Sequence, residues 1–342
     1  MEIYDTEKDL PTKVQTSNLN EQLGQVDYVF SDKTGTLTCN LMEFKKLSVG
    51  KYPYGVDAPQ CRDAQEKDVT NFNFEDESFF QHMNDKQHEN YANIKSFLTH
   101  LAVCHTVVAE AKDGKTLYNA SSPDELALVN AAKYFGYFFK GRDDDNNIEV
   151  EILGRTTVFQ LLYVIEFSSD RKRMTVIVKT PEGKIKVMCK GADSIIEERL
   201  ANTPRNAEIK NEANRHLDKY AASGLRTLML AEKDISNSDY EEWKQEYRVA
   251  ASAMSKRDER MAEVADKLER GFDLIGATAI EDKLQDDVDK AIYAMKKAGI
   301  KVWVLTGDKV ETAINIGYSC QLLNAQMELF IIDGKNKATC LS

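Results

Sequence analysis

The chain has 342 residues, of which 42% are hydrophobic and 30% charged, so it can build substantial apolar cores and, at ~150 residues per domain, about two domains. Its formal net charge of −11 argues against a nucleic-acid partner, because a phosphate backbone attracts a basic surface. No apolar run reaches the ~18 residues of a membrane helix, and six scattered cysteines without a CxxC pair are typical of reduced cytosolic thiols.

The first predicted strand, residues 26–30, is short and mostly apolar, as strands buried in parallel sheets are. A polar loop, Ser-Asp-Lys-Thr-Gly-Thr, follows it. A carboxylate at the end of such a strand can attack a γ-phosphate and become an aspartyl phosphate, which makes Asp32 the candidate nucleophile. Hydroxyls and close backbone N–H groups for the phosphoryl oxygens would come from Thr34, Gly35 and Thr36.

The middle of the chain mixes helical and strand patterns. Residues 51–90 are polar and turn-rich and are expected to form a mobile loop. Helices are expected over 93–109, 122–135, 193–200 and 209–223, strands over 163–167, 174–179 and 185–189, and one long or broken helical stretch over 240–268. His100, Cys104 and His105 are interpreted as helical core rather than a zinc site, because no fourth ligand is evident.

A second strand and loop lie near the other end of the chain. The apolar run 300–305 is followed by Thr306, Gly307 and Asp308 and then by a helical pattern over 310–318. A hydroxyl and a glycine amide at a helix N-terminus favour an anion, although a capped strand–helix turn would look the same. Two such units predict a doubly wound α/β sheet with its ligand site at the carboxyl ends of the strands, and the long segment between them predicts an inserted second domain.

Several of these motifs resemble those of a known family. DKTGTLT (32–38) is similar to the phosphorylation motif of P-type ATPases, in the haloacid dehalogenase superfamily. In that superfamily's phosphatases the residue two past the nucleophile is usually Asp, whereas here it is Thr34, which implies a long-lived phosphoenzyme coupled to conformational change. Longer stretches resemble the P4 subfamily, the phospholipid flippases: TCNLMEF (38–44), YNASSPDELALVNAAKYFGY (118–137), FSSDRKRMTVIV (167–178), KGADSIIEERL (190–200), GLRTL (224–228), IEDKLQDDV (280–288) and residues 298–323.

The resemblance implies a fold and a division into domains. We expect a haloacid-dehalogenase-like Rossmannoid phosphorylation (P) domain made of residues 1–44 and 271–342, interrupted by an α+β nucleotide-binding (N) domain over 45–270 that is built on an antiparallel sheet. The family's GDGxND segment, its dephosphorylation loop and its membrane helices are not in the sequence, so the P domain is expected to be incomplete. ATP binding by the inserted domain is expected to survive in this soluble, monomeric fragment, and catalysis is not.

The resemblance also assigns roles to single residues. Asp32, Lys33 and Thr34 would be catalytic, with Mg²⁺ between Asp32, the Thr34 carbonyl and the phosphoryl group. Phe167 would stack on adenine, with core packing as the alternative. Six further residues are expected to bind ATP. Three of them lie in the second loop: Thr306, Gly307 and Asp308. The other three each have a structural alternative, namely a solvated turn for Lys190, a structural ion pair for Arg226 and a capping box for Glu125. Arg171 and Lys172 are expected on an exposed hairpin.

The whole parent protein would then be an integral membrane enzyme, an ATP-driven phospholipid translocase with ATP and Mg²⁺ as cofactors and an accessory β-subunit as partner. This chain would lie on the cytoplasmic face. Three alternatives remain: a nucleotide-binding module without catalysis, a soluble phosphatase, and a cation pump. Thr34 in place of an acid disfavours the phosphatase. Ion pumps share DKTGT and TGD but usually lack SPDE and the FSSxRKRM form, which disfavours the pump.

Overall fold

The computed structural model describes residues 4–5, 10–11, 21–22, 24–56, 69–112, 115–307, 310–324 and 326–331. The chain divides into two compact units. The smaller consists of Met1–Thr38, Leu284–Asp308 and Ile316–Ser342, and the larger of Cys39–Lys283 with Lys309–Asn315. Within the described ranges, no helix has both the length and the apolar character needed to cross a membrane.

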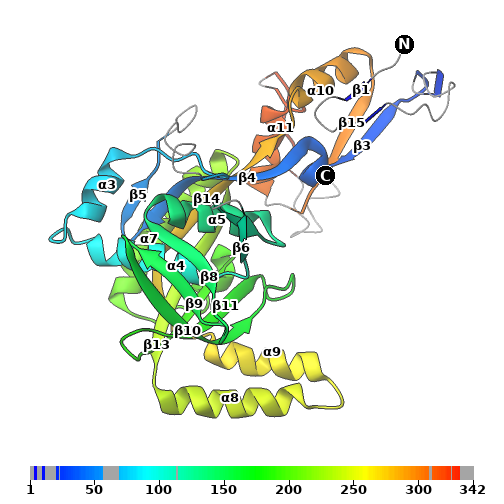
Figure 1. The fold of residues 1–342 in the computed structure, drawn as a ribbon. Helices are drawn as coiled ribbons and strands as arrows, with labels where there is room; N and C mark the ends of the chain where they lie inside the picture. The colour runs from blue at the N-terminus through cyan, green and yellow to red at the C-terminus, as the bar shows by residue number, and fades with distance from the viewer. Residues whose placement is uncertain are drawn as a thin grey trace. The chain divides into compact units, whose positions relative to one another are not determined.

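The larger unit is built on a nine-stranded sheet (Figure 1). Adjacent strands from β14 to β8 are antiparallel, which confirms the predicted antiparallel sheet. The order across the sheet is β5 (Tyr52–Tyr54), β4 (Thr38–Val49), β14 (Asp273–Leu284), β13 (Arg226–Ile235), β12 (Ile185–Gly191), β11 (Arg173–Lys179), β10 (Arg155–Ile165), β9 (Ile148–Ile152) and β8 (Tyr137–Arg142). A separate hairpin joins β6 (Val108–Lys112) to β7 (Lys115–Asn119).

Both faces of the central strands are covered by helices. Side chains alternate along a strand, so Val176 and Val178 enter one core while Ile177 enters the other. This explains why the centre of β11, residues 176–178, is a continuous apolar run rather than an alternating one. The first core includes residues of α3 (Glu77–Asn84), α4 (Tyr91–Val103) and α5 (Pro123–Tyr134), and the second includes residues of α6 (Asp193–Glu197), α7 (Pro204–Ala222), α8 (Asn237–Ala251) and α9 (Arg257–Leu268).

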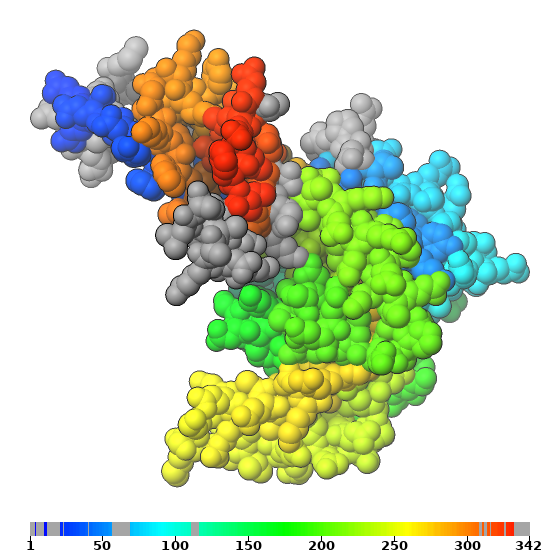
Figure 2. Space-filling model, turned by 180° about the vertical axis from the view of Figure 1, so that it is seen from behind, coloured from blue at the N-terminus to red at the C-terminus, as the bar shows by residue number. Residues whose placement is uncertain are grey.

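Residues 51–90 and 240–268 of the larger unit were expected to form a mobile loop and one long or broken helical stretch. The prediction of a loop over 51–90 is wrong where the structure describes it, because β5 and α3 form there and bury Tyr54 and Phe79. The residues that enter the core here are isolated aromatic side chains in a polar segment, and they do not recur at the spacing of a helix or a strand, so the sequence carries no periodic signal. The stretch 240–268 is a broken helix: α8 and α9 lie side by side as a hairpin (Figure 1), which forms the yellow ridge in Figure 2.

The histidines near the end of α4 are core residues. His100, within α4, is fully buried, and neither of its ring nitrogens has a hydrogen-bond partner among the described residues. His105 follows the helix and is also buried. Its Nε2–H donates to the Ala102 carbonyl at 2.9 Å, and its Nδ1 accepts from the Val107 N–H at 3.2 Å. Both imidazoles are therefore held neutral.

Acid should destabilise the larger unit through these two histidines. Burial lowers the pKa of His100 well below its ordinary value of 6.5 and, together with the Lys190 charge, lowers the pKa of His105 to about 3. Below pH 6.5 the unfolded chain therefore binds protons that the folded chain does not, and the free energy of unfolding decreases as the pH is lowered. We expect a loss of about 1 kcal/mol per histidine between pH 7.5 and 5.5, measured by urea unfolding.

The control for this pH dependence is His100→Leu, which keeps an apolar side chain where no ring hydrogen bond is made. Its loss of stability between pH 7.5 and 5.5 should be smaller than that of the unsubstituted chain by about 1 kcal/mol, because His105, His82 and His216, whose pKa values burial also lowers, remain. An equal loss in both proteins would show that His100 does not contribute.

The smaller unit contains a parallel strand pair, β3 (Tyr28–Asp32) and β15 (Lys301–Leu305). Its core gathers Leu37, Ile292 from α10 (Val288–Lys297), and Ile316 and Cys320 at the end of α11 (Val310–Ser319). A short pairing of β1 (Tyr4–Asp5) with β2 (Leu10–Pro11) completes the described strands. The two strands predicted from residues far apart in the sequence are thus parallel neighbours.

Candidate functional site

The carboxyl ends of β3 and β15 lie next to each other. In the parallel register Asp32, the last residue of β3, is opposite Leu305, the last residue of β15. Thr306 and Gly307 continue directly from that point, so the two predicted loops leave the sheet at the same edge. The exposed Asp32 carboxylate accepts a hydrogen bond from the Lys33 N–H at 2.8 Å. Asp308 lies outside the described residues.

The loop after Asp32 is one wide turn over Lys33–Leu37. It closes when the Thr38 N–H donates to the Lys33 carbonyl, and the Gly35 N–H donates to Thr38 Oγ1 at 3.0 Å. Gly35 has φ +76°, a left-handed conformation that glycine adopts without strain. The turn exposes Thr34 beside Asp32 but buries Lys33. The surface at this edge therefore offers a carboxylate and threonine groups.

In the larger unit, Glu125 and Lys190 form a buried ion pair. Lys190 Nζ on β12 donates to Glu125 Oε1 on α5 at 2.7 Å, and both residues are 7% exposed. The Thr106 N–H and Oγ1 donate to Glu125 Oε2 at 3.1 and 2.8 Å. Burial favours a neutral Glu125, but the Lys190 charge and these hydrogen bonds outweigh it and lower the pKa of the carboxyl. Lys190 is thus not a solvated turn lysine. Glu125 does not complete a capping box either, because its carboxylate contacts Lys190 and Thr106.

Asp124 and Arg226 extend this charged cluster. Arg226, the first residue of β13, lies 3.5 Å from Asp124 Oδ2, and its side chain is 39% exposed. Burial raises the pKa of Asp124, an effect that Arg226 and Lys190 oppose and Asp282 reinforces. The sequence interpretation did not single out Asp124, although it directly precedes Glu125. Arg226 therefore forms the ion pair that was its structural alternative, and its side chain remains partly exposed to solvent.

Phe167 lies between β10 and β11 and is 62% exposed, so core packing does not account for it. Its turn is tied to the end of β12. The Lys172 N–H donates to the Ser168 carbonyl at 2.7 Å, and the Ala192 N–H donates to the Lys172 carbonyl at 3.0 Å. A Cβ on Gly191 would lie 2.6 Å from that same carbonyl oxygen, so this contact requires glycine. The turn with Phe167 is thereby held next to the strand end with Lys190.

The expectation of an exposed basic hairpin is wrong for Arg171. Its guanidinium pairs with Glu269, which follows α9 and is wholly buried. Arg173 Nε also donates to Glu269, at 2.7 Å, and Thr175 Oγ1 donates to the same carboxylate. The sequence interpretation missed Glu269 because it is 98 residues from Arg171 and no motif marks it.

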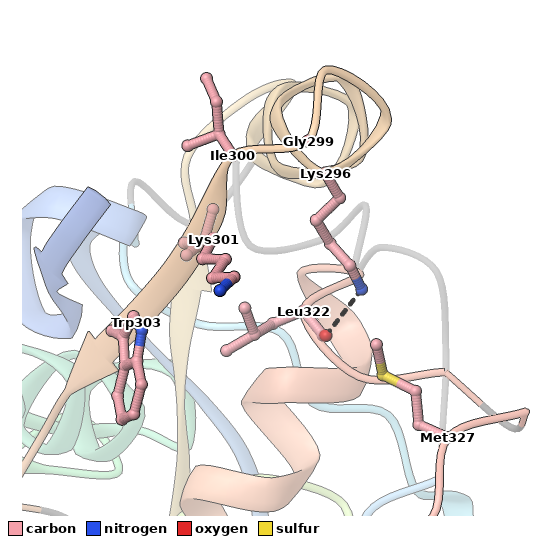
Figure 3. Close-up of a pocket in the computed structure, with 8 residues that line it drawn as sticks. Lys296, Gly299, Ile300, Lys301, Trp303, Leu322 and Met327 are labelled. Atoms are coloured by element: carbon pink, nitrogen blue, oxygen red, sulfur yellow. Dashed lines mark hydrogen bonds between the residues drawn. The ribbon is translucent and has the colours of Figure 1, made fainter. Parts of the chain in front are cut away.

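Within the part of the chain that the structure describes, no group of three or more His, Cys, Asp or Glu side chains is placed to hold a metal ion. A cavity of about 410 Å³ in the smaller unit is shown in Figure 3. None of the predicted site residues lines it, and one of its two lysines, Lys296, already donates to the Leu322 carbonyl at 2.9 Å.

Comparison with known proteins gives consistent matches. The family model described as P-type ATPase, cytoplasmic domain N matches residues 93–287. Phospholipid-transporting ATPase IC of Xenopus tropicalis is 45% identical over 338 residues, which cover 96% of this chain and 26% of that protein. Phospholipid-transporting ATPase DRS2 of Saccharomyces cerevisiae is 45% identical over 340 residues, or 98% of this chain and 25% of that protein. The chain thus spans about a quarter of the length of these relatives.

Proposed function

The chain belongs to the P-type ATPases, and from this premise we propose that it is the ATP-binding and phosphorylation region of an ATP-driven phospholipid translocase. The observation that carries the proposal is the pairing of Leu305 with Asp32. It brings a reactive carboxylate and the Thr306–Gly307 loop to one sheet edge, where an enzyme of this kind needs its nucleophile and its phosphate-binding groups.

We further propose that residues 1–44 and 271–342, which include the smaller unit, form a haloacid-dehalogenase-like P domain, and that residues 45–270 form an inserted N domain. The discontinuous smaller unit supports this, because its three segments come from both ends of the chain. The large antiparallel sheet and the family match over 93–287 support a nucleotide-binding N domain.

In the proposed reaction an Asp32 oxygen attacks the γ-phosphorus of ATP. A bond forms from the carboxylate to phosphorus, the bond from phosphorus to the bridging β,γ-oxygen breaks, and ADP leaves with that electron pair. Lys33, Thr34, Thr306, Gly307 and Asp308 are assigned to holding the phosphoryl group and shaping its loop. Thr34 supplies no acid for hydrolysis, so the aspartyl phosphate persists.

The Asp32 carboxylate and the Thr34 carbonyl fit Mg²⁺, because the ion prefers hard oxygen donors and both residues are exposed at this edge. When bound, the ion neutralises charge on the phosphates. In the larger unit Phe167 is assigned to adenine, Arg226 to the phosphates, and Lys190 to the nucleotide pocket, where it offers positive charge to ATP. Glu125, at 2.7 Å from Lys190, holds that ammonium in place.

The parent protein's lipid transport, its membrane location and an accessory β-subunit belong to this proposal. The names of the relatives support phospholipid as the transported class.

Replacing Phe167 with Ala should weaken ATP binding to this chain by roughly 10- to 100-fold, because a stacked base contributes ~1–3 kcal/mol. Calorimetric titration with ATP measures the change. Tyr293→Ala, which removes a 60% exposed aromatic ring from α10, is the control and should leave the Kd unchanged. An unaltered Kd in Phe167→Ala would reject this residue as the adenine platform, and absence of ATP binding to the parent chain would reject the nucleotide site.

A further inference from the structure

We propose that Arg171 is a positioning residue for nucleotide binding, and that it holds the Phe167 turn by linking it to the buried Glu269 carboxylate at the end of α9. The inference rests on the proposed function, in which Phe167 is the adenine platform. It assigns to the α8–α9 hairpin, through Glu269, an influence on ATP affinity.

Arg171 contacts the residues on both sides of Phe167. Its Nη1 donates to the Glu166 carbonyl at 2.7 Å, and its backbone N–H donates to Ser168 Oγ at 3.3 Å. Its Nη2 pairs with Glu269. One side chain therefore links the backbone before Phe167 to a carboxylate on another element, while its backbone contacts the residue after Phe167.

Glu269 is suited to be a fixed anchor. Its side chain is fully buried, and besides Arg171 it accepts hydrogen bonds from Arg173 Nε and Thr175 Oγ1. Arg173 also pairs with Asp266 in the last turn of α9 at 3.1 Å. These bonds do not depend on Arg171, so its removal leaves the Glu269 carboxylate paired with another cation.

The link matters because Phe167 has little packing of its own. At 62% exposure its ring depends on the backbone of its turn for orientation. A ring held in its bound orientation before ATP arrives loses less conformational entropy on binding. Arginine can make this link because its guanidinium offers several N–H donors in a fixed fork, whereas the single ammonium of a lysine cannot reproduce that geometry.

The test is a double-mutant cycle read by ATP calorimetry on the whole chain. Arg171→Met should raise the Kd roughly three- to tenfold, and Arg171→Lys should do nearly the same. In a Phe167→Ala background, Arg171→Met should change the Kd less than about twofold, because the group that it positions is gone. Arg270→Met is the matched control: Arg270 pairs with Asp266 at the same end of α9, and its side chain is 63% exposed.

The outcomes separate this inference from the proposed function. If Phe167→Ala weakens binding and Arg171→Met does not, the inference fails and the platform stands. If Arg171→Met weakens binding equally in both backgrounds, Arg171 acts on ATP directly and the inference fails. If Phe167→Ala has no effect, the platform and the inference fail together. Thermal unfolding of each variant identifies a folding defect. If Arg171→Met does not fold, the decision rests on Arg171→Lys, which keeps a cation beside Glu269 but loses the guanidinium fork, and an unchanged Kd in Arg171→Lys then counts against the inference.

Discussion

Replacing Asp32 with Asn in the full-length protein should abolish ATP-driven phospholipid transfer and formation of an acid-stable phosphoenzyme, by at least about a thousandfold. An amide keeps the size and position of the side chain at the end of β3 but is a poor nucleophile toward phosphorus. ATP binding should persist, because the groups assigned to adenine are in the larger unit.

Asp27→Asn is the matched control for this prediction. Asp27 is an exposed aspartate directly before the opposite end of the same strand, where its carbonyl accepts from the Lys301 N–H at 2.9 Å. This variant should form phosphoenzyme and transfer lipid normally. Transfer that survives Asp32→Asn would overturn the assignment of the nucleophile, and loss of transfer in both variants would point to damage to the strand rather than to the chemistry.

Replacing Lys190 with Met should destabilise the larger unit by about 3–5 kcal/mol, because it leaves the Glu125 charge buried without its cation. The hydrogen bonds from Thr106 would remain, but the ammonium that neutralises the carboxylate would be gone. Urea unfolding at pH 7 measures the loss. Adding Glu125→Gln to Lys190→Met should restore part of the stability by removing the unpaired charge, and Lys184→Met, which removes a 70% exposed lysine just before β12, should change stability little.

Acid should reduce this difference between Lys190→Met and the parent. The pKa of Glu125 is below its ordinary value of 4.5 in the folded parent, so the pairing stabilises the fold above pH 4.5 and its contribution is lost as the pH falls further. In Lys190→Met the carboxyl can protonate more readily, which removes the penalty from the variant as well. A difference that is independent of pH would show that the lost stability comes from packing rather than from charge.

The placement of Asp32 and the Thr306–Gly307 loop at one sheet edge of the smaller unit could be predicted, because each group directly follows a short apolar run in the sequence. Asp32, Thr34 and Gly35 are within four residues, and the apolar runs before Asp32 and Thr306 do pair as parallel strands. The expectation that these runs are buried is wrong, because Phe30, Trp303 and Leu305 are each more than half exposed. The motif order also led to the correct family, which the relatives confirm. The antiparallel sheet of the larger unit followed from that resemblance rather than from periodicity.

By itself, then, the sequence determined the family and the order of the chemistry-bearing residues, because these depend on neighbours along the chain, and the family resemblance in turn predicted the antiparallel sheet. Only the tertiary structure decided the environment of each side chain. From the sequence, Phe167 could either stack on adenine or pack in a core, and Lys190 could either lie at the nucleotide pocket or in a solvated turn. The structure exposes the phenylalanine and buries the lysine. It also pairs Glu125 with Lys190 across 65 residues and Arg171 with Glu269 across 98. Such pairs form when strands and helices pack in three dimensions, and no local pattern of residues records them.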